Sequence, residues 1–172
     1  MRLTRASTLD VETLNRIWCY FQDGGPDNLQ NFLRYAATLT GREMAWRESA
    51  PVANAGRFAA GCRAGKAGDL RASLIFYRSL YLADDVAPIT TLADALAARG
   101  FAVDAHYVAS LKEPESENIV AQALDAFAPD VVINSTAFSA RRENGAVLDR
   151  ADAPVLQVAL ATSTYEAWST SA

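Results

Sequence analysis

The chain has 172 residues, of which 51% are hydrophobic, and a formal net charge of −4. This apolar content is enough for one sizeable core, so we expect one α/β domain with an added helical segment. The acidic balance offers no basic surface for nucleic acid or anionic lipid, and no apolar run approaches the ~20 residues that a bilayer requires. We therefore expect no nucleic acid and no membrane as a partner. Two cysteines far apart in the sequence and no leader segment predict a cytoplasmic protein.

Residues 1–41 predict a helical hairpin. Ser7 and Asp10 have the spacing of a capping box, and apolar residues then recur at helical intervals, which predicts a first helix from about Leu9 to Gln22. A glycine pair breaks this helix. A second apolar stripe follows from Pro26 to a closing glycine at position 41.

Residues 42–72 show neither a helical nor a strand period, and glycines are spread among small and basic residues. This stretch predicts a flexible connection. Gly61, Gly65 and Lys66 come near a phosphate-binding loop, but the spacing is one residue short and Ala67 stands where the loop needs a hydroxyl. We predict no nucleotide site there.

Residues 73–172 predict a parallel α/β domain. The expected strands are Leu74–Tyr77, Ala102–Ala109, Val131–Ile133 and Val155–Leu160, and helical stripes lie between the first three. Strands that alternate with helices favour a flavodoxin- or Rossmann-like parallel sheet of about four strands with flanking helices. The four consecutive apolar residues of the first strand place it in mid-sheet, and the alternating second strand lies nearer an edge. A further helix begins close to the last residue, so we expect the domain to be incomplete at its C-terminal end.

Polar residues follow the predicted strands where open α/β sheets place ligands. The candidate ligand-binding residues are Arg78 and Asp85 after the first strand, and Asn134 and Thr136 after the third. Each has a simpler alternative. Arg78 can pair with a neighbouring carboxylate, Asp85 can favour a helix N-terminus, and the other two can cap a turn.

His106 is the only histidine, which excludes a multi-histidine metal site within this chain. It shares one face of the second predicted strand with Asp104, away from the strand end. This position favours a structural or edge-exposed histidine over a catalytic one. We predict no catalytic residue and no metal ligand.

Five blocks of the chain resemble one family, in order and over nearly the whole length. They are YFQDGGPDNLQNFLRY from Tyr20, FYRSLYLADDVAPITTLADALAARGF from Phe76, SLKEPES from Ser110, INSTAFSAR from Ile133 and DRADAPVLQVALATSTYEAW from Asp149. The blocks resemble the CobN-type large subunit of aerobic cobaltochelatase, which is related to the large subunit of magnesium chelatase. The family usually has glycine at the position of Asp84, where only glycine adopts a positive φ cheaply, and a Gly-Ser pair near Thr162-Ser163.

The resemblance implies a parent of well over a thousand residues that inserts Co²⁺ into hydrogenobyrinic acid a,c-diamide during cobalamin synthesis. It also implies two AAA-type ATPase partner subunits that bind ATP and Mg²⁺. We expect this amino-terminal segment to bind no cofactor and to be inactive alone.

Three alternatives stay open. The chain is a stand-alone small-molecule-binding module, a segment similar to the magnesium chelatase large subunit, or an interaction domain that docks the ATPase subunits or a second copy.

Overall fold

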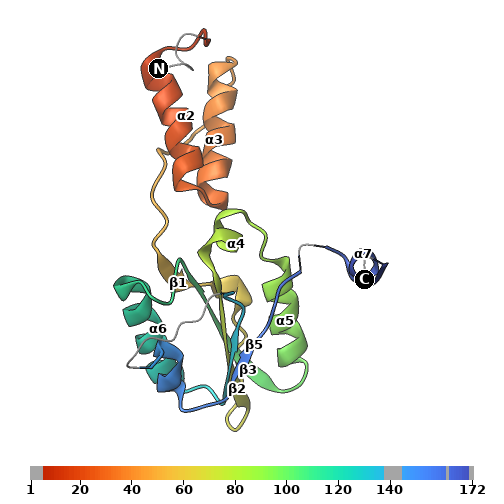
Figure 1. Cartoon of the computed structure of the whole chain (residues 1–172). Coiled ribbons are helices and arrows are strands. Elements are labelled where there is room, and N and C mark those ends of the chain that lie inside the picture. Colours follow the sequence, from red (N-terminus) through yellow and green to blue (C-terminus); the bar gives the residue numbers. More distant parts are fainter. Residues whose placement is uncertain (1–5, 138–144, 162, 171–172) are drawn as a thin grey trace. The chain divides into compact units, whose positions relative to one another are not determined.

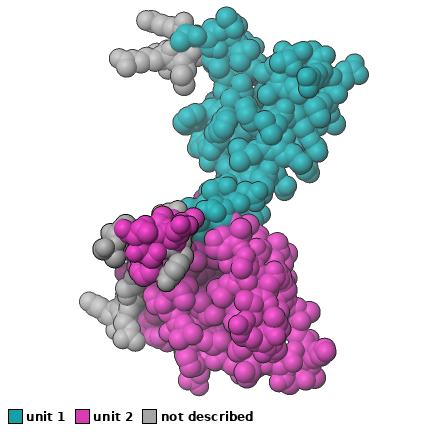
Figure 2. Space-filling view, turned by 90° about the vertical axis from the view of Figure 1, so that its right-hand side faces the viewer, with its two compact units in different colours: residues 1–53, 79–85 teal, residues 54–78, 86–172 magenta. Residues whose placement is uncertain are grey.

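A computed structural model describes residues 6–137, 145–161 and 163–170, and the chain forms two compact units. Unit 1 comprises residues 1–53 and 79–85, and unit 2 comprises residues 54–78 and 86–172 (Figure 2). The boundaries differ from those of the predicted hairpin, connection and α/β domain. Residues 79–85, which fall within the predicted α/β domain, are grouped with the hairpin in unit 1.

The hairpin of unit 1 consists of α2 (Val11–Asp23) and α3 (Pro26–Leu39). The cap of α2 is Asp10, whose Oδ1 accepts from the Thr13 amide at 2.8 Å. The prediction that Ser7 caps this helix is wrong, because its Oγ instead accepts from the amide of Leu9 at 3.0 Å. A carboxylate at this place satisfies an orphan amide and suits the helix dipole.

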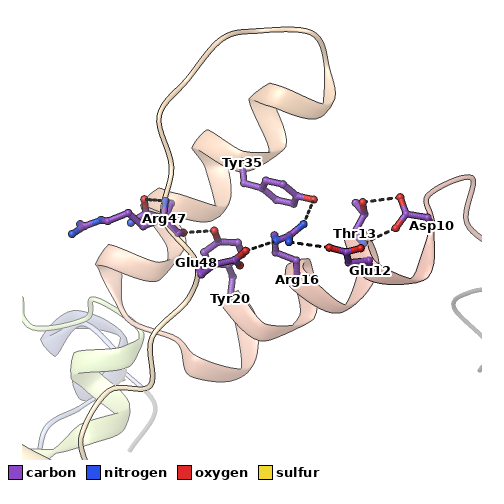
Figure 3. A network of polar contacts seen from close by, with 9 residues as sticks. Asp10, Glu12, Thr13, Arg16, Tyr20, Tyr35, Arg47 and Glu48 are labelled. Atoms are coloured by element: carbon purple, nitrogen blue, oxygen red, sulfur yellow. Dashed lines mark hydrogen bonds and ion pairs between the residues drawn. The ribbon is translucent and has the colours of Figure 1, made fainter.

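The side of the hairpin that is buried is lined by polar side chains. Tyr20 is fully buried and Tyr35 is 4% exposed. The Tyr20 hydroxyl donates to the carbonyl of Arg47, and Arg16 donates to Tyr35 and Glu48 at 3.3 and 2.8 Å (Figure 3). The segment that follows α3 is thereby fastened along the hairpin by hydrogen bonds to side chains of both helices.

Unit 2 is built on a five-stranded sheet in the order β1-β3-β2-β4-β5. The strands are β1 (Ala55–Arg57), β2 (Leu70–Tyr77), β3 (Phe101–Val108), β4 (Val131–Asn134) and β5 (Val155–Gln157). β2 to β5 run parallel, and β1 pairs with β3 in the antiparallel sense. The four parallel strands have the spatial order second-first-third-fourth, which is flavodoxin-like and confirms the predicted fold class.

Helices cover both faces of this sheet (Figure 1). These helices are α5 (Ala87–Ala97), α6 (Pro114–Phe127) and the 3₁₀ segments η1 (Ala59–Gly61) and η2 (Val147–Ala151). The short α7 (Tyr165–Thr170) follows β5 along the chain. On the α6 side, Ile75, Val108 and Val132 of three strands pack with Leu124 in the main core cluster. The opposite face carries Phe76, whose ring lies 5.4 Å from that of Phe58.

Two predictions about residues 42–108 need correction. Residues 42–72 are not a connection without secondary structure, because β1 and η1 lie within them and β2 begins at Leu70. The strand at Phe101–Val108 lies nearer an edge than β2, as predicted, and β1 covers its outer side. The turn after the first predicted strand contains α4 (Arg78–Leu82). Short, glycine-rich β1 escapes detection because it has only three residues and no apolar run.

The left-handed residue after α4 is Asp84, with φ of 56°. This is the position where the resemblance places a glycine, and the amides of Asp84 and Asp85 close α4 by donating to Tyr81 and Leu80 at 3.2 and 2.9 Å. Aspartate tolerates this conformation better than most residues. The turn therefore forms without glycine.

No helix in the described part of the chain is long and apolar enough to cross a membrane.

Candidate functional site

The strand order creates a switch point between β2 and β4. The chain passes from β2 to β3 on one side and from β3 to β4 on the other, so the carboxyl ends of β2 and β4 flank the place where the connections diverge. Doubly wound sheets bind ligands in the crevice at such a point. Tyr77 ends β2 there, and residues 134–136 end β4.

A closed polar cluster occupies the β4 side of this point. Asn134 is 3% exposed and Thr136 is 2% exposed. The Asn134 Oδ1 accepts from the amide and the hydroxyl of Thr136 at 3.2 and 2.9 Å, and its Nδ2 donates to Gln157 Oε1 at 2.9 Å. Gln157 Nε2 in turn donates to the Thr136 carbonyl at 2.6 Å. These bonds hold the loop after β4 to edge strand β5.

Further bonds fasten the same loop to β2. The amide and hydroxyl of Ser135 both donate to the carbonyl of Ile75, at 2.8 and 3.1 Å. The Ala137 amide donates to the Tyr77 hydroxyl at 3.0 Å. The first residues after β4 are thus fixed from both neighbouring strands, which makes a rigid rim at the switch point.

The structure brings two of the four predicted site residues together. Asn134 and Thr136 share the cluster above. Arg78 is half-buried as the first residue of α4 in unit 2, and Asp85 is exposed in unit 1. A ligand role for the four residues stays a prediction. Thr162, singled out beside Ser163, lies outside the described residues.

A second polar cluster lies on the α6 side of the sheet, where β1 meets β3. Arg57 pairs in register with His106, and its Nε donates to Asp104 Oδ1 at 2.7 Å. The Cys62 thiol donates to the same oxygen at 3.2 Å. The Arg57 side chain is 59% exposed while that of Asp104 is 12% exposed. Arg57 therefore neutralises a mostly buried carboxylate from the outside.

His106 lies beside this pair and is buried. It is 5% exposed, and its Nδ1 lies 3.7 Å from Asp104 Oδ2 without a hydrogen-bond partner among the described residues. Burial lowers the pKa of the imidazole, an effect that Asp104 opposes and Arg57 reinforces. The predicted structural or edge-exposed histidine is a buried one. A lowered pKa keeps it neutral at pH 7.

Cys62 is not activated as a nucleophile. Burial is the main cause of the raised pKa of this thiol, and its bond to Asp104 adds to the effect. A thiol held protonated is a poor nucleophile and a poor metal ligand. Among the described residues, no three Cys, His, Asp or Glu side chains are grouped so that they could hold a metal ion.

A cavity of about 630 Å³ opens beside the second cluster. Arg57, Asp104 and His106 supply its polar wall, and Ala123, Ala126 and Phe127 of α6 supply an apolar one. Arg63 adds a second guanidinium to the lining, and such a mixture of arginines, a carboxylate and an apolar surface suits a small amphipathic molecule. Sequence patterns missed this site because β1 brings Arg57 to it. The signal available was that Asp104 and His106 share one face of a strand.

Four parallel strands, with connections that diverge between β2 and β4 and leave a crevice at their carboxyl ends, define a doubly wound α/β module. A family model described as CobN/Magnesium Chelatase matches residues 18–172, and the chain belongs to this family. The resemblance stated for the five sequence blocks is confirmed.

Two curated relatives have the same printed name, aerobic cobaltochelatase subunit CobN. The one from Sinorhizobium sp is 32% identical over 187 aligned positions, which cover 96% of this chain and 15% of the relative. The one from Pseudomonas aeruginosa is 29% identical, with 96% of this chain and 14% of the relative covered. The chain thus spans about one seventh of the length of these relatives.

A solved structure supports the fold independently. The catalytic subunit of cobaltochelatase from Mycobacterium tuberculosis matches with a TM-score of 0.73 and 21% identity, over 98% of this chain and 15% of that one. At this identity the comparison bears on the fold alone. It confirms the α/β architecture with a helical amino-terminal part.

Proposed function

We propose that this chain is an amino-terminal segment of a cobaltochelatase large subunit whose complete form inserts Co²⁺ into hydrogenobyrinic acid a,c-diamide. The observation that carries the proposal is the match to CobN over 96% of this chain within only 15% of the relative. Two AAA-type ATPase partner subunits supply the energy by hydrolysing ATP with Mg²⁺, and the reaction takes place in the cytoplasm. The cobaltochelatase relatives favour the cobalt branch over the magnesium branch.

Within that subunit the segment acts as a scaffold. Metal insertion needs a base that removes protons from ring nitrogens and a site that strips water from the ion. The polar atoms of Asn134 and Thr136 are engaged with one another and with Gln157, and Cys62 has a raised pKa. His106 is buried in unit 2, and this burial lowers its pKa. These facts support a segment that is inactive alone.

The test replaces the matching segment of the Sinorhizobium large subunit by this chain. We expect the chimera, mixed with both ATPase subunits, ATP, Mg²⁺, Co²⁺ and hydrogenobyrinic acid a,c-diamide, to form the cobalt product at a measurable rate. The subunit with the segment deleted should form none. A matched control carries Leu124→Asp, which places a charge in the core and should abolish activity by preventing folding.

Two results would contradict this proposal. An inactive chimera that is nevertheless folded, as judged by circular dichroism, would show that the segment cannot serve in a cobaltochelatase. Cobalt insertion by the isolated 172-residue chain with the same partners would show that it carries its own reacting groups.

A second candidate function is small-molecule binding in the cavity beside Arg57 and His106. Its volume of about 630 Å³ and mixed wall favour it. Titration of the chain with hydrogenobyrinic acid a,c-diamide or a flavin should raise the melting temperature, and Arg57→Gln should remove the shift. Absence of any shift at millimolar ligand with the unchanged chain would eliminate this function.

A further inference from the structure

The two helices of the hairpin use opposite sides for different purposes. On one side lie the buried polar residues of α2 and α3, and residues 42–52 run along it. Asn28 Oδ1 accepts from the Ala50 amide and Asn31 Oδ1 from the Arg47 amide, both at 3.0 Å. The chain itself therefore covers this side.

The other side carries an apolar stripe on each helix. Its members recur at helical spacing, and we call them together the apolar face: Val11, Leu14, Trp18 and Phe21 of α2, with Leu29, Phe32 and Leu33 of α3. The rings of Phe21 and Phe32 lie 4.8 Å apart, so the two stripes form one surface.

The apolar face is largely open to solvent. Val11 is 68% exposed, Leu33 66%, Trp18 58% and Phe21 54%. Single exposed apolar residues are ordinary, but a contiguous set with a tryptophan and a phenylalanine marks a surface that another element covers. The uncharged amides of Asn15, Gln22 and Gln30 flank the face, and all are exposed.

We propose that the apolar face is an interface inside the large subunit. An amphipathic helix from the part of the subunit beyond this segment covers it. This inference rests on the proposed function. The curated relatives contain the matched region as 15% and 14% of one polypeptide, so most of the same chain is available to cover it. Two antiparallel apolar stripes are the surface that a helix of a bundle covers.

The charge of the hairpin argues against a lipid surface as the occupant. Residues 10–39 carry four acidic side chains, Asp10, Glu12, Asp23 and Asp27, and two basic ones, Arg16 and Arg34. Interfacial helices that bind anionic lipid have a polar face rich in Lys and Arg. The uncharged rim also gives no steering for a transient charged partner, whereas a permanent interface within one chain needs none.

The test uses the full-length chimeric subunit described above with a photoreactive benzoylphenylalanine at one position. Residues 18 and 33 lie on the apolar face, and residues 15 and 30 are exposed controls beside it. After irradiation, we expect cross-links from 18 and 33 to helical peptides beyond the segment, mapped by mass spectrometry, and few from 15 and 30. Equal yields from all four positions, or none from 18 and 33, would overturn the inference.

Two further measurements separate the other occupants and the two proposals. Cross-links from 18 or 33 between two copies, or a dimer of the isolated chain in sedimentation that Trp18→Ser dissociates, would assign the face to a second copy and overturn the inference. The chelatase activity of the unmodified chimera is read separately. An active chimera without the expected cross-links contradicts the interface alone, and a folded but inactive one contradicts the proposed function.

Discussion

The two units bury different kinds of side chain. Unit 2 buries valine, isoleucine and leucine between its sheet and helices, whereas the hairpin of unit 1 buries tyrosine and asparagine and leaves Trp18 and Phe21 exposed. The core of unit 2 includes Ile75, Val120 and Leu124, each at most 1% exposed. Its stability thus follows from apolar area removed from water. The interior of unit 1 depends on hydrogen bonds to the backbone of residues 47–50. The comparison teaches that one apolar pattern can mark a core in one unit and an interface in the other.

The largest expected effect tests the apolar core. Leu124→Ala leaves a cavity beneath α6 and should lower the free energy of unfolding of unit 2 by about 2–5 kcal/mol. The measurement is urea denaturation followed by circular dichroism. Leu156→Ala is the matched control, because this leucine is 53% exposed and its loss should cost less than about 0.5 kcal/mol. Equal losses from both variants would contradict the assignment of the core.

The next effect tests the polar interior of the hairpin. Asn28→Ala removes two bonds donated by Nδ2, to the Gly24 and Ala50 carbonyls at 2.7 Å, and one accepted from the Ala50 amide. Leaving these backbone groups unpaired should destabilise unit 1 by about 1–3 kcal/mol. Fluorescence of Trp46, which lies 4.6 Å from the Tyr35 ring, reports the change.

Asn15→Ala is the control for that substitution, because Asn15 lies on α2 and is exposed. We expect its unfolding midpoint to match that of the unchanged chain within error. A hairpin that tolerates Asn28→Ala as well as Asn15→Ala would show that residues 42–52 are not held by the asparagines.

The smallest effect concerns pH. Burial holds the pKa of His106 below its ordinary value of about 6.5, so the folded state binds this proton less tightly than the unfolded state. The contribution of His106 to the free energy of unfolding is therefore fully present above the pKa that this residue has in the unfolded state. It decreases as the pH falls from about 6.5 towards the lower pKa of the folded state. Urea midpoints measured from about pH 7.5 to 5.5 should decline, and His106→Asn should reduce the decline. A slope unchanged by that substitution would contradict the depressed pKa.

Much of this architecture was accessible from the sequence where the local signals agree. The apolar quartet Leu74–Tyr77 lies in the centre of the sheet, and the helix with proline at its start and Gly100 after its end forms as α5. These elements carry stripe, start and stop signals together. The signals are local, so a single sequence suffices to find them.

The remainder depends on pairing between distant residues. β1 has three residues and is defined by its register with Val108, Tyr107 and His106, which no local period announces. The same pairing places Arg57 beside Asp104 and buries His106, for which the sequence left a structural and an edge-exposed role open. The hairpin shows a different limit. Its apolar stripes were found, but periodicity alone does not say whether a stripe faces its own interior or another element.

The chain leaves unit 1 at residue 53 and returns to it for residues 79–85. In this returning piece the Leu82 carbonyl accepts from the Gly25 amide at 3.0 Å, and the Leu82 side chain lies against Gly24. During synthesis, residues 79–85 of unit 1 are therefore made only after strands β1 and β2 of unit 2. A single proteolytic nick between residues 53 and 54 would leave Leu82 on the other product, so neither product would contain a whole unit 1.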